Sequence, residues 1–484
     1  MVITGYRYSF LSWRWPVVLF FMMFSNLSFG LFRTLAAVTL ALTCTLAGSV
    51  RLSGAERQGR VLRVALVGDP QVDNPVEMGY ARRSIYRDLR GRRDLDLCIF
   101  LGDLVNDNMS LLPESLNIID SLPFQSFMVP GNHDRDVYRG TKSSGSMSRS
   151  RDLSTWRKLV GYVDTSFVRG NVRFIMMNNV RHAAAGMTDY VGGFTEKQKH
   201  WLDSVLVTDA ARGGKTSRGI RPSRGKVTPA LTILATHIPF SQMKGRDSVL
   251  ALIPGHTRML YVSGHTHFVS RDNSIPEVIA GATCGSWWRG VKDSDGVPYA
   301  LQSCGAPRGY FVADISRDGD YTLRYRCVGR DDEVSVWGVR EDDSGVCRLY
   351  INVFGGAPDG VVKVRGARRW RIVSRGNKVW SDDGSDSPDA FMGSPRKKRY
   401  LVCERSAKTA PEVEQVIEFN ASMSRDYRKS HRDEFIPLRR KPSTHLWQTT
   451  DFVSGPLPVY VNVVYRDSHM RFRQRVPVTM VSKH

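Results

Sequence analysis

The sequence lacks the paired cysteines of a small zinc-binding domain. One of its seven cysteines, Cys44, lies in the first 50 residues, and none of the other six belongs to a CxxC pair, so a zinc ribbon is not indicated. No disulfide framework can be deduced either, because six cysteines allow fifteen pairings and the spacing favours none of them. Internal repeats are absent as well. The fold and function therefore have to be inferred from the hydrophobic pattern and the polar motifs.

Acidic residues are scarce relative to basic ones. The 484 residues include 47 Asp and Glu against 69 Lys and Arg, a formal net charge of +22. This balance favours anionic partners such as phosphorylated substrates, acidic membrane surfaces or nucleic acid. Nucleic acid is disfavoured among these, because the sequence has no nucleic-acid-binding motif and its Arg residues are scattered. A general abundance of Arg in the proteome explains the charge equally well.

The first 50 residues differ in kind from the rest and are predicted to be a signal peptide or membrane leader. Pro16–Phe24 is apolar, and a second apolar run, Leu35–Leu46, follows Arg33 and precedes small residues, as in a signal peptide. The second run is too short to span a bilayer comfortably. We therefore expect an exported protein, in the periplasm or cell envelope, with a membrane anchor made of both runs as the alternative. Translation that starts at Met22 or Met23 is a further hypothesis.

Residues 60–328 have the hydrophobic pattern of an α/β or α+β sandwich domain. The length suggests two domains beyond the leader, and 42% hydrophobic residues suffice for packed cores. Strands covered on both faces are predicted at Val61–Gly68, Leu97–Leu101, Phe127–Val129, Val172–Met177, Leu231–Ala235 and Leu260–Val262. Glu196–Leu206 is the clearest predicted helix, because Thr195 and Gln198 have capping-box spacing.

Residues 346–484 are predicted to form a small β-rich domain after a charged linker at residues 329–345. Apolar runs separated by polar turns occur at Cys347–Phe354, Gly360–Val364, Trp370–Val373 and Val459–Tyr465. Short strands separated in this way suggest a small β-sandwich.

Polar residues follow the carboxyl ends of five strands predicted in residues 60–328. They are Asp69, Asp103, Asn132, His237 and His265. A capping Asp or a buried His is the commoner explanation for any one of them. Five together predict one shared site, because sites in layered α/β sheets form at the carboxyl ends of strands.

The segments that contain these residues have the chemistry of a phosphoester-cleaving metal site. They read Asp69-Pro70-Gln71, Gly102-Asp103, Gly131-Asn132-His133-Asp134, Thr236-His237-Ile238 and Gly264-His265-Thr266-His267. Carboxylate, amide and imidazole groups are ligands for Mn, Fe or Zn. Two such cations can neutralise phosphate oxygens and provide a nucleophile at neutral pH. Glycine before a ligand permits the tight turn that brings it near the ions.

In this order, the segments resemble the motifs of the calcineurin-like metallophosphoesterase superfamily over Val61 to about Cys327. The resemblance implies an α/β (α+β) four-layer fold, a β-sandwich flanked by helices, with a small C-terminal β-sandwich-like domain as in exported bacterial members. It implies two divalent ions (Mn, Fe, Zn or Mg) and a metal-bridging hydroxide as the nucleophile. One ion would be held by Asp69, Gln71, Asp103 and His267, and the other by Asp103, Asn132, His237 and His265.

The resemblance also implies roles beside the metals. His133 would contact the phosphate or protonate the leaving oxygen, and Asp107 and Asp134 are candidates for orienting it or a ligand. Gln71 stands where most of the superfamily has His, and its neutral amide is a weaker ligand, but a D-x-Q subgroup shares this feature. Trp287 and Trp288 form either a wall for a ring or lipid group or part of the core.

The leading functional prediction is hydrolysis of a phosphomonoester or phosphodiester, with a phosphorylated small molecule, lipid or glycan as substrate. Two alternatives are an envelope-associated binding protein in which Gln71 marks a weakened metal site, and a nuclease. The intact His133, His265 and His267 argue against the binding protein. Only the charge suggests the nuclease.

Overall fold

The computed structural model describes residues 62–139, 149–182, 190–208, 229–272, 274–340, 346–365, 371–374, 378–380, 400–454 and 460–481. The predicted leader, residues 1–50, lies outside this part of the chain. Val61–His484 forms one compact unit, and no helix among the described residues is long and apolar enough to cross a membrane. All six described cysteines are free, and five of them are buried.

The first of two central sheets carries the strands that precede the first three motifs. Its order is β15-β14-β1-β2-β3, with β1 at Leu62–Val67, β2 at Leu97–Phe100, β3 at Gln125–Met128, β14 at Gly309–Ile315 and β15 at Tyr321–Cys327. β1, β2 and β3 run parallel, so their carboxyl ends lie at one edge. Parallel neighbours need crossovers, and helices supply them. The crossover helices are α2 (Pro75–Ala81), a π-helical turn (Arg82–Tyr86), α3 (Arg87–Gly91) and α4 (Leu112–Asp120).

The second central sheet carries the strands that precede the last two motifs. Its order is β12-β13-β11-β10-β7-β6, with β6 at Thr165–Arg169, β7 at Val172–Met176, β10 at Leu231–Ala235, β11 at Met259–Ser263, β12 at Val269–Asp272 and β13 at Glu277–Ala280. β7, β10, β11 and β13 run parallel. Helices α6 (Glu196–Thr208) and α7 (Arg246–Leu250) pack on this sheet through Leu202 and Val249. The predicted capping box of α6 is confirmed, since Thr195 and Gln198 each accept a hydrogen bond from the other's backbone N–H, at 3.2 and 3.0 Å.

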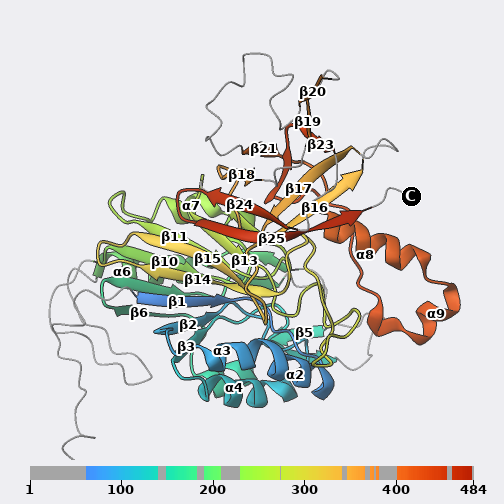
Figure 1. Cartoon of the computed structure of the whole chain (residues 1–484). Coiled ribbons are helices and arrows are strands. Elements are labelled where there is room, and N and C mark those ends of the chain that lie inside the picture. The colour runs from blue at the N-terminus through green and yellow to red at the C-terminus, as the bar shows by residue number, and fades with distance from the viewer. Residues whose placement is uncertain are drawn as a thin grey trace, which may run out of the picture. The chain divides into compact units, whose positions relative to one another are not determined.

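The two sheets face each other and helices cover their outer sides, which confirms the predicted four-layer α/β class (Figure 1). Successive side chains of a strand point to opposite faces, so each strand contributes to two cores. In β2, Ile99 joins Phe174 and Ile233 in the core between the sheets. Its neighbour Phe100 joins Leu112 in the core beneath the helices. The remaining elements here are α5 (Ser154–Val160) and the strand pairs β4 (Asp136–Arg139) with β5 (Arg149–Asp152) and β8 (Val180–His182) with β9 (Tyr190–Gly192).

The C-terminal part forms a sheet that closes on itself. Seven strands follow the order β16-β25-β24-β18-β21-β22-β17, and β17 pairs again with β16. Their bounds are β16 Val334–Arg340, β17 Cys347–Val353, β18 Val361–Arg365, β21 Leu401–Arg405, β22 Leu446–Thr449, β24 Tyr460–Arg466 and β25 Arg471–Val481. Strands β23 (Phe452–Ser454), β19 (Arg371–Ser374) and β20 (Lys378–Trp380) extend from β17. The predicted β-rich character is confirmed, but the strands make a closed barrel and not a sandwich, because closure pairs the edges that a sandwich leaves open.

The predicted linker at residues 329–345 is wrong where β16 lies. This strand pairs with both β17 and β25, and Val334 and Val336 on its buried face enter the core. Helices α8 (Pro411–Ser422) and α9 (Arg425–Ser430), which lie between β21 and β22, were not predicted.

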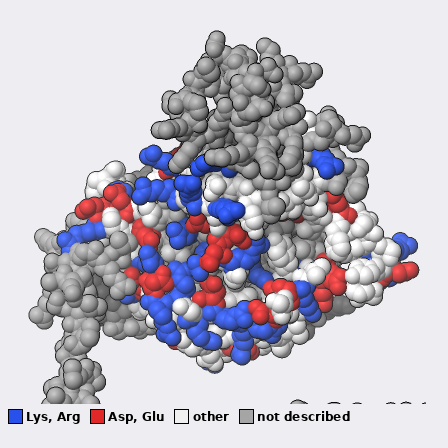
Figure 2. Space-filling model, in the orientation of Figure 1, with Lys and Arg blue, Asp and Glu red and all other residues white. Residues whose placement is uncertain are grey.

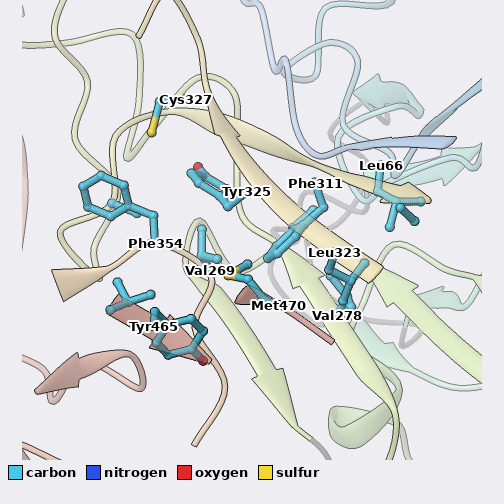
Figure 3. Close-up of a cluster of buried hydrophobic side chains, with 14 of the residues drawn as sticks. Leu66, Val269, Val278, Phe311, Leu323, Tyr325, Cys327, Phe354, Tyr465 and Met470 are labelled. Atoms are coloured by element: carbon cyan, nitrogen blue, oxygen red, sulfur yellow. The ribbon is translucent and has the colours of Figure 1, made fainter. Parts of the chain in front are cut away.

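The barrel and the second central sheet are joined by a buried ion pair and a shared core. Arg271 in β12 contacts Asp467 after β24 at 2.7 Å, with both side chains almost fully buried. Figure 3 shows Phe354 and Tyr465 of the barrel region gathered with Val269 and Phe311 of the central sheets. Because the core is continuous, the domain boundaries at residues 328 and 346 stay a prediction.

Candidate metal centre

The five motif segments meet at the carboxyl ends of strands from both central sheets. Asp69, Asp103 and Asn132 follow β1, β2 and β3, which are parallel neighbours in the first sheet. His237 and His265 follow β10 and β11, which are parallel neighbours in the second. The two sheets face each other, so side chains from distant parts of the chain are brought to one place.

The tightest contacts of the site surround the His237 ring. Its Nε2 lies 2.9 Å from Asn132 Oδ1, 3.1 Å from His265 Nδ1 and 3.3 Å from Asp103 Oδ2. Asp103, His237 and His265 offer atoms that all lie within 4.8 Å of one another, a spacing suited to a metal ion. The structure thus brings together four of the predicted ligands.

The opposite nitrogen of His237 shows what this cluster requires. Its Nδ1 lies 2.8 Å from the Leu101 carbonyl oxygen, which can only accept, so Nδ1 carries a proton. In the neutral ring Nε2 then presents a lone pair to two further acceptors, Asn132 Oδ1 and Asp103 Oδ2, an arrangement that a cation would hold together. Burial opposes a charged ring, yet the Asp103 and Asp69 carboxylates raise the pKa of His237 to about 9. Positive charge at this position therefore stabilises the cluster.

The other two histidines have the opposite character. Burial, assisted by the charge of His237, lowers the pKa of His265 to about 3 and, again with burial as the main cause, that of His267 to about 4. Both rings are neutral near pH 7 and keep a lone pair. Neutral imidazole is the form that ligates metals.

The remaining predicted ligands lie beside this cluster. Asp69 is fully buried, and its Oδ2 accepts a hydrogen bond from the His265 N–H at 2.7 Å and lies 3.9 Å from His267 Nε2. Among the described residues, Asp69 Oδ1 has no hydrogen-bond donor within hydrogen-bond distance, and it lies 3.6 Å from His237 Nδ1. Gln71 lines the same pocket and is almost fully buried. The donor set thus fits divalent metal ions.

Gln71 has a neighbour that the sequence did not reveal. This neighbour is Cys284, whose Sγ lies 3.7 Å from Gln71 Oε1 and 3.8 Å from His267 Nδ1. On its other side, Gln71 Nε2 lies 3.4 Å from Asn106 Oδ1. Cys284 is fully buried, and burial raises the pKa of its thiol well above the usual value. The thiol therefore packs behind Gln71 and His267 in its protonated form.

Backbone strain is concentrated at the site. Among the described residues, seven that are not glycine have positive φ angles, and six of them are predicted site residues: Asp69, Gln71, Asp103, Asp107, His265 and His267. Such conformations are costly for residues with a Cβ and persist where the surrounding fold imposes them, often at functional sites. The fold thus holds these side chains in place at the expense of local stability.

The glycines before the ligands allow the predicted close approach. A Cβ on Gly131 would come 2.0 Å from Asp103 Oδ1, and a Cβ on Gly264 would come 2.7 Å from Asp69 Oδ1. No side chain at either position could be accommodated without moving a ligand.

His133 lies at the edge of the cluster and contacts Asp107. Its Nδ1 is 3.2 Å from Asp107 Oδ1, and its backbone N–H donates to Asp103 Oδ1 at 2.9 Å. Burial opposes protonation of the ring, but the contact with Asp107 and the charges of Asp103 and Asp107 outweigh it and raise the pKa of His133. Asp134 instead accepts hydrogen bonds from the Val105 and Gly131 N–H groups, so it fixes the loop.

A cavity of about 380 Å³ opens over the cluster. Its lining residues are Gln71, Asp103, Asn132, His133, Tyr190, His265, Thr266, His267, Ser286, Trp287, Ser303, Pro437, Leu438, Arg439 and Lys441. Trp287 lies 5.5 Å from the His267 ring and forms a wall, whereas Trp288 is buried and donates to the Pro70 carbonyl at 2.9 Å. The core interpretation therefore holds for Trp288, whereas contact of Trp287 with a ring or lipid group stays a prediction.

Sequence reasoning missed part of this lining. Tyr190, whose ring meets that of His265 edge-on at 5.5 Å, stands apart from every motif. Residues 437–441 come from the C-terminal part of the chain. The sequence shows the basic run Arg439-Arg440-Lys441, but only the tertiary structure shows that this run reaches the site.

Comparison with known proteins agrees with the fold and the motifs. Residues 62–269 match the family model of calcineurin-like phosphoesterases, and residues 277–385 match the model described as the C terminal of calcineurin-like phosphoesterase. Together the two matches cover more than half of the chain. No curated protein matches the sequence.

Two solved structures show a remote likeness. Purple acid phosphatase PPD1 from yellow lupin (Lupinus luteus) seeds is 16% identical with a TM-score of 0.33, over 56% of this chain and 52% of that one. NAD nucleotidase (NadN) from Haemophilus influenzae is 12% identical with a TM-score of 0.28, over 55% and 50%. The chain thus spans about half the length of each.

The four-layer fold and the assembled motifs define a metallophosphoesterase. With the two matched models, the chain belongs to the calcineurin-like phosphoesterase family, whose members are hydrolases that act on phosphoester bonds.

Proposed function

We propose that this chain hydrolyses a phosphomonoester or phosphodiester at a site that holds two divalent metal ions, Mn, Fe, Zn or Mg. The observation that carries the proposal is the convergence of Asp103, Asn132 and His265 on His237 Nε2 within 3.3 Å. Carboxylate and amide oxygens and imidazole nitrogens are ligands of such cations, and their close spacing fits a bound cation.

The metal-holding roles follow from the placement of the side chains. One ion would be held by Asp69, Gln71, Asp103 and His267, and the other by Asp103, Asn132, His237 and His265. When bound, the ions would neutralise the phosphate oxygens and make a hydroxide nucleophile available at neutral pH. Asp103 would serve both ions. Leu101 and the strained turns fix the orientation of the ligands before any metal arrives.

His133 would serve as the proton donor to the leaving oxygen. Its ring lines the cavity beside Asp103 and Asn132, and its pKa is raised by Asp107. A protonated imidazole can donate to the oxygen that carries the developing charge. Asp107 would act as a positioning residue, because it contacts the ring atom Nδ1 and leaves Nε2 for the substrate.

The substrate would be a phosphorylated small molecule, lipid or glycan. A cavity of about 380 Å³ that opens to solvent accommodates the phosphate and the adjoining part of such a substrate. Figure 2 shows basic side chains interspersed with acidic ones on the face in view, without the single basic stripe that a nuclease would use. Export to the periplasm or cell envelope stays a proposal that rests on the leader alone.

The proposal is tested with p-nitrophenyl phosphate and bis-p-nitrophenyl phosphate and the purified protein, with Mn²⁺, Zn²⁺, Mg²⁺ or Fe²⁺ added after chelation. We expect metal-dependent turnover of at least one substrate, lowered in His133→Ala. His200→Ala is the matched control, because His200 is exposed on α6 away from the cavity. Equal turnover of phenyl phosphate, whose leaving oxygen needs protonation, by His133→Ala and the unmodified protein would refute the proposed role of His133, and no metal-dependent turnover of any substrate would refute the hydrolytic function.

A further inference from the structure

The cavity over the candidate metal centre is lined on one side by a segment that follows the two C-terminal helices. This segment, residues 437–441, is here called the basic segment, and it contributes Pro437, Leu438, Arg439 and Lys441 to the lining. The other lining residues belong to the two-sheet part of the molecule. A ligand in this cavity would therefore contact both parts of the chain.

Buried residues and hydrogen bonds anchor the chain before and after the basic segment. Before it, Ile436 is buried with Leu301 and Leu446, and its carbonyl accepts a hydrogen bond from Asn420 Nδ2 at 2.7 Å. The preceding turn docks on the loop after Trp287 and Trp288, because the Gly290 N–H donates to the Asp433 carbonyl at 2.7 Å.

After the basic segment, the chain is fixed again. Ser443 is buried and its N–H donates to the Lys408 carbonyl at 3.1 Å, while Thr444 Oγ1 donates to the Val269 carbonyl at 3.5 Å. Two anchored ends only a few residues apart leave the basic segment little freedom. Its cations are thus presented to the cavity by the fold.

The three consecutive cations of the basic segment have different surroundings. Arg440 forms an ion pair with Glu414 of α8 at 2.8 Å and does not line the cavity. Arg439 and Lys441 line the cavity, and no carboxylate among the described residues forms an ion pair with either. Two cations beside a pocket, without anionic partners, can bind an anionic ligand.

The lining residues differ in exposure, and this difference separates the two cations from the metal centre. Asp103 and Gln71 at the floor are almost fully buried, whereas Arg439 and Lys441 are exposed at the rim. Half-buried Trp287 and Leu438 contribute apolar surface to the same cavity. The scissile phosphate would occupy the floor, so the rim cations are available to a different part of the substrate.

We infer that Arg439 and Lys441 bind a second anionic group of the substrate, a carboxylate or a further phosphate, separated from the scissile phosphate by a short apolar or aromatic portion. This inference rests on the proposed phosphoesterase function and adds the substrate class. The C-terminal part of the chain then acts as a specificity element for the site.

The test uses two nearly isosteric substrates, 4-carboxyphenyl phosphate and 4-carbamoylphenyl phosphate, which differ in the charge of the distal group. We expect the unmodified metal-loaded protein to have the higher kcat/KM for the carboxylate. The double variant Arg439→Gln, Lys441→Gln should lose about tenfold on the carboxylate, the contribution of two partly exposed ion pairs, and at most about twofold on the amide. Arg440→Gln should change neither value, and 0.5 M NaCl should shrink the preference by screening.

The possible outcomes separate this inference from the proposed function. Equal losses on both substrates, or no loss on either, would overturn the inference, because the rim cations would then serve the scissile phosphate or nothing. Absence of turnover would count against the proposed function alone, since calorimetry with the two corresponding non-hydrolysable aryl phosphonates still measures the preference. A double variant that binds both phosphonates as the unmodified protein does would overturn the inference by itself.

Discussion

Replacement of Asp69 by Asn is expected to stabilise the metal-free protein and to reduce its stabilisation by added metal. Asp69 is fully buried, and its Oδ1 has no hydrogen-bond donor among the described residues. Burial, opposed by His237 and reinforced by Asp103, raises the pKa of Asp69 well above the usual value. A carboxyl group whose pKa is higher in the folded state destabilises the fold as pH rises from its unfolded pKa through its folded pKa. Asp69 therefore lowers the stability of the metal-free protein near pH 7.

The expected magnitude follows from the contacts. Asn keeps an acceptor for the His265 N–H, which donates at 2.7 Å, and removes only the charge. Removal of a buried, poorly compensated charge should raise the free energy of unfolding by about 2 kcal/mol. In a folded unit of this size that corresponds to a rise in Tm of roughly 2–4 °C. Metal at a hundredfold excess over Kd should stabilise the unmodified protein by about 2.7 kcal/mol, and much less in the variant.

Asp467→Asn is the matched control with the opposite sign. The Asp467 side chain is shielded from solvent like that of Asp69, but it is paired with the buried Arg271 at 2.7 Å and lies outside the site. Loss of the Asp467 charge leaves Arg271 buried without its ionic partner. The free energy of unfolding should fall by about 3–5 kcal/mol, and the response to metal should not change. The assay is thermal unfolding at pH 7.5 in EDTA and with Mn²⁺. A lower Tm for Asp69→Asn in EDTA, or an undiminished metal shift, would refute the reasoning.

Further substitutions test individual roles at the site. Asp103→Asn should abolish metal-dependent hydrolysis of p-nitrophenyl phosphate, because we propose that the Asp103 carboxylate holds both ions. A near-normal rate would disprove this assignment. His133→Ala should lower kcat by about 10²-fold to 10⁴-fold. The loss should be greater for phenyl phosphate than for p-nitrophenyl phosphate, because the p-nitrophenyl leaving group needs little protonation. Equal losses on the two substrates would exclude His133 as a proton donor. Since Asp107 raises the pKa of His133, the alkaline limb of the pH–rate profile should move to lower pH in Asp107→Asn, and an unmoved limb would refute the positioning role. Gln71→His should tighten binding at the first metal site by about tenfold in calorimetry, because imidazole is a stronger ligand than a neutral amide; unchanged affinity would mean that Gln71 holds no metal.

Much of the fold was predictable because buried strands are short and apolar. β1, β2, β10 and β11 are largely buried and appear in the sequence as short apolar runs rich in Val, Ile and Leu. Their parallel arrangement brings the following residues to one edge, which is why the location of the site could be predicted. The motifs then added the identities of the candidate ligands.

The strands of the barrel were harder to predict. In β25, exposed Arg471, Arg473 and Arg475 alternate with half-buried Phe472 and Gln474, so the strand reads as a polar segment. The exposure of one face to solvent leaves only a weak alternating pattern. Barrel closure was also invisible, because it depends on the pairing of β16 with both β17 and β25.

The surroundings of the site depended on contacts between distant residues. Cys284 packs against Gln71 although more than 200 positions separate them. The adjacent Arg439 and Arg440 are chemically identical, yet one lines the cavity and the other pairs with Glu414. Local sequence cannot distinguish two such neighbours, because the difference arises from the docking of the segment.

The most direct test of a two-metal phosphoesterase is a metal titration of turnover. The protein is stripped of metal, and hydrolysis of p-nitrophenyl phosphate and bis-p-nitrophenyl phosphate is followed as Mn²⁺ or Zn²⁺ is added in fractions of an equivalent. We predict no turnover in the stripped protein and a rise that levels off at two equivalents per chain. Turnover that is undiminished in the stripped protein, absent at every metal concentration, or complete at one equivalent would contradict a two-metal phosphoesterase.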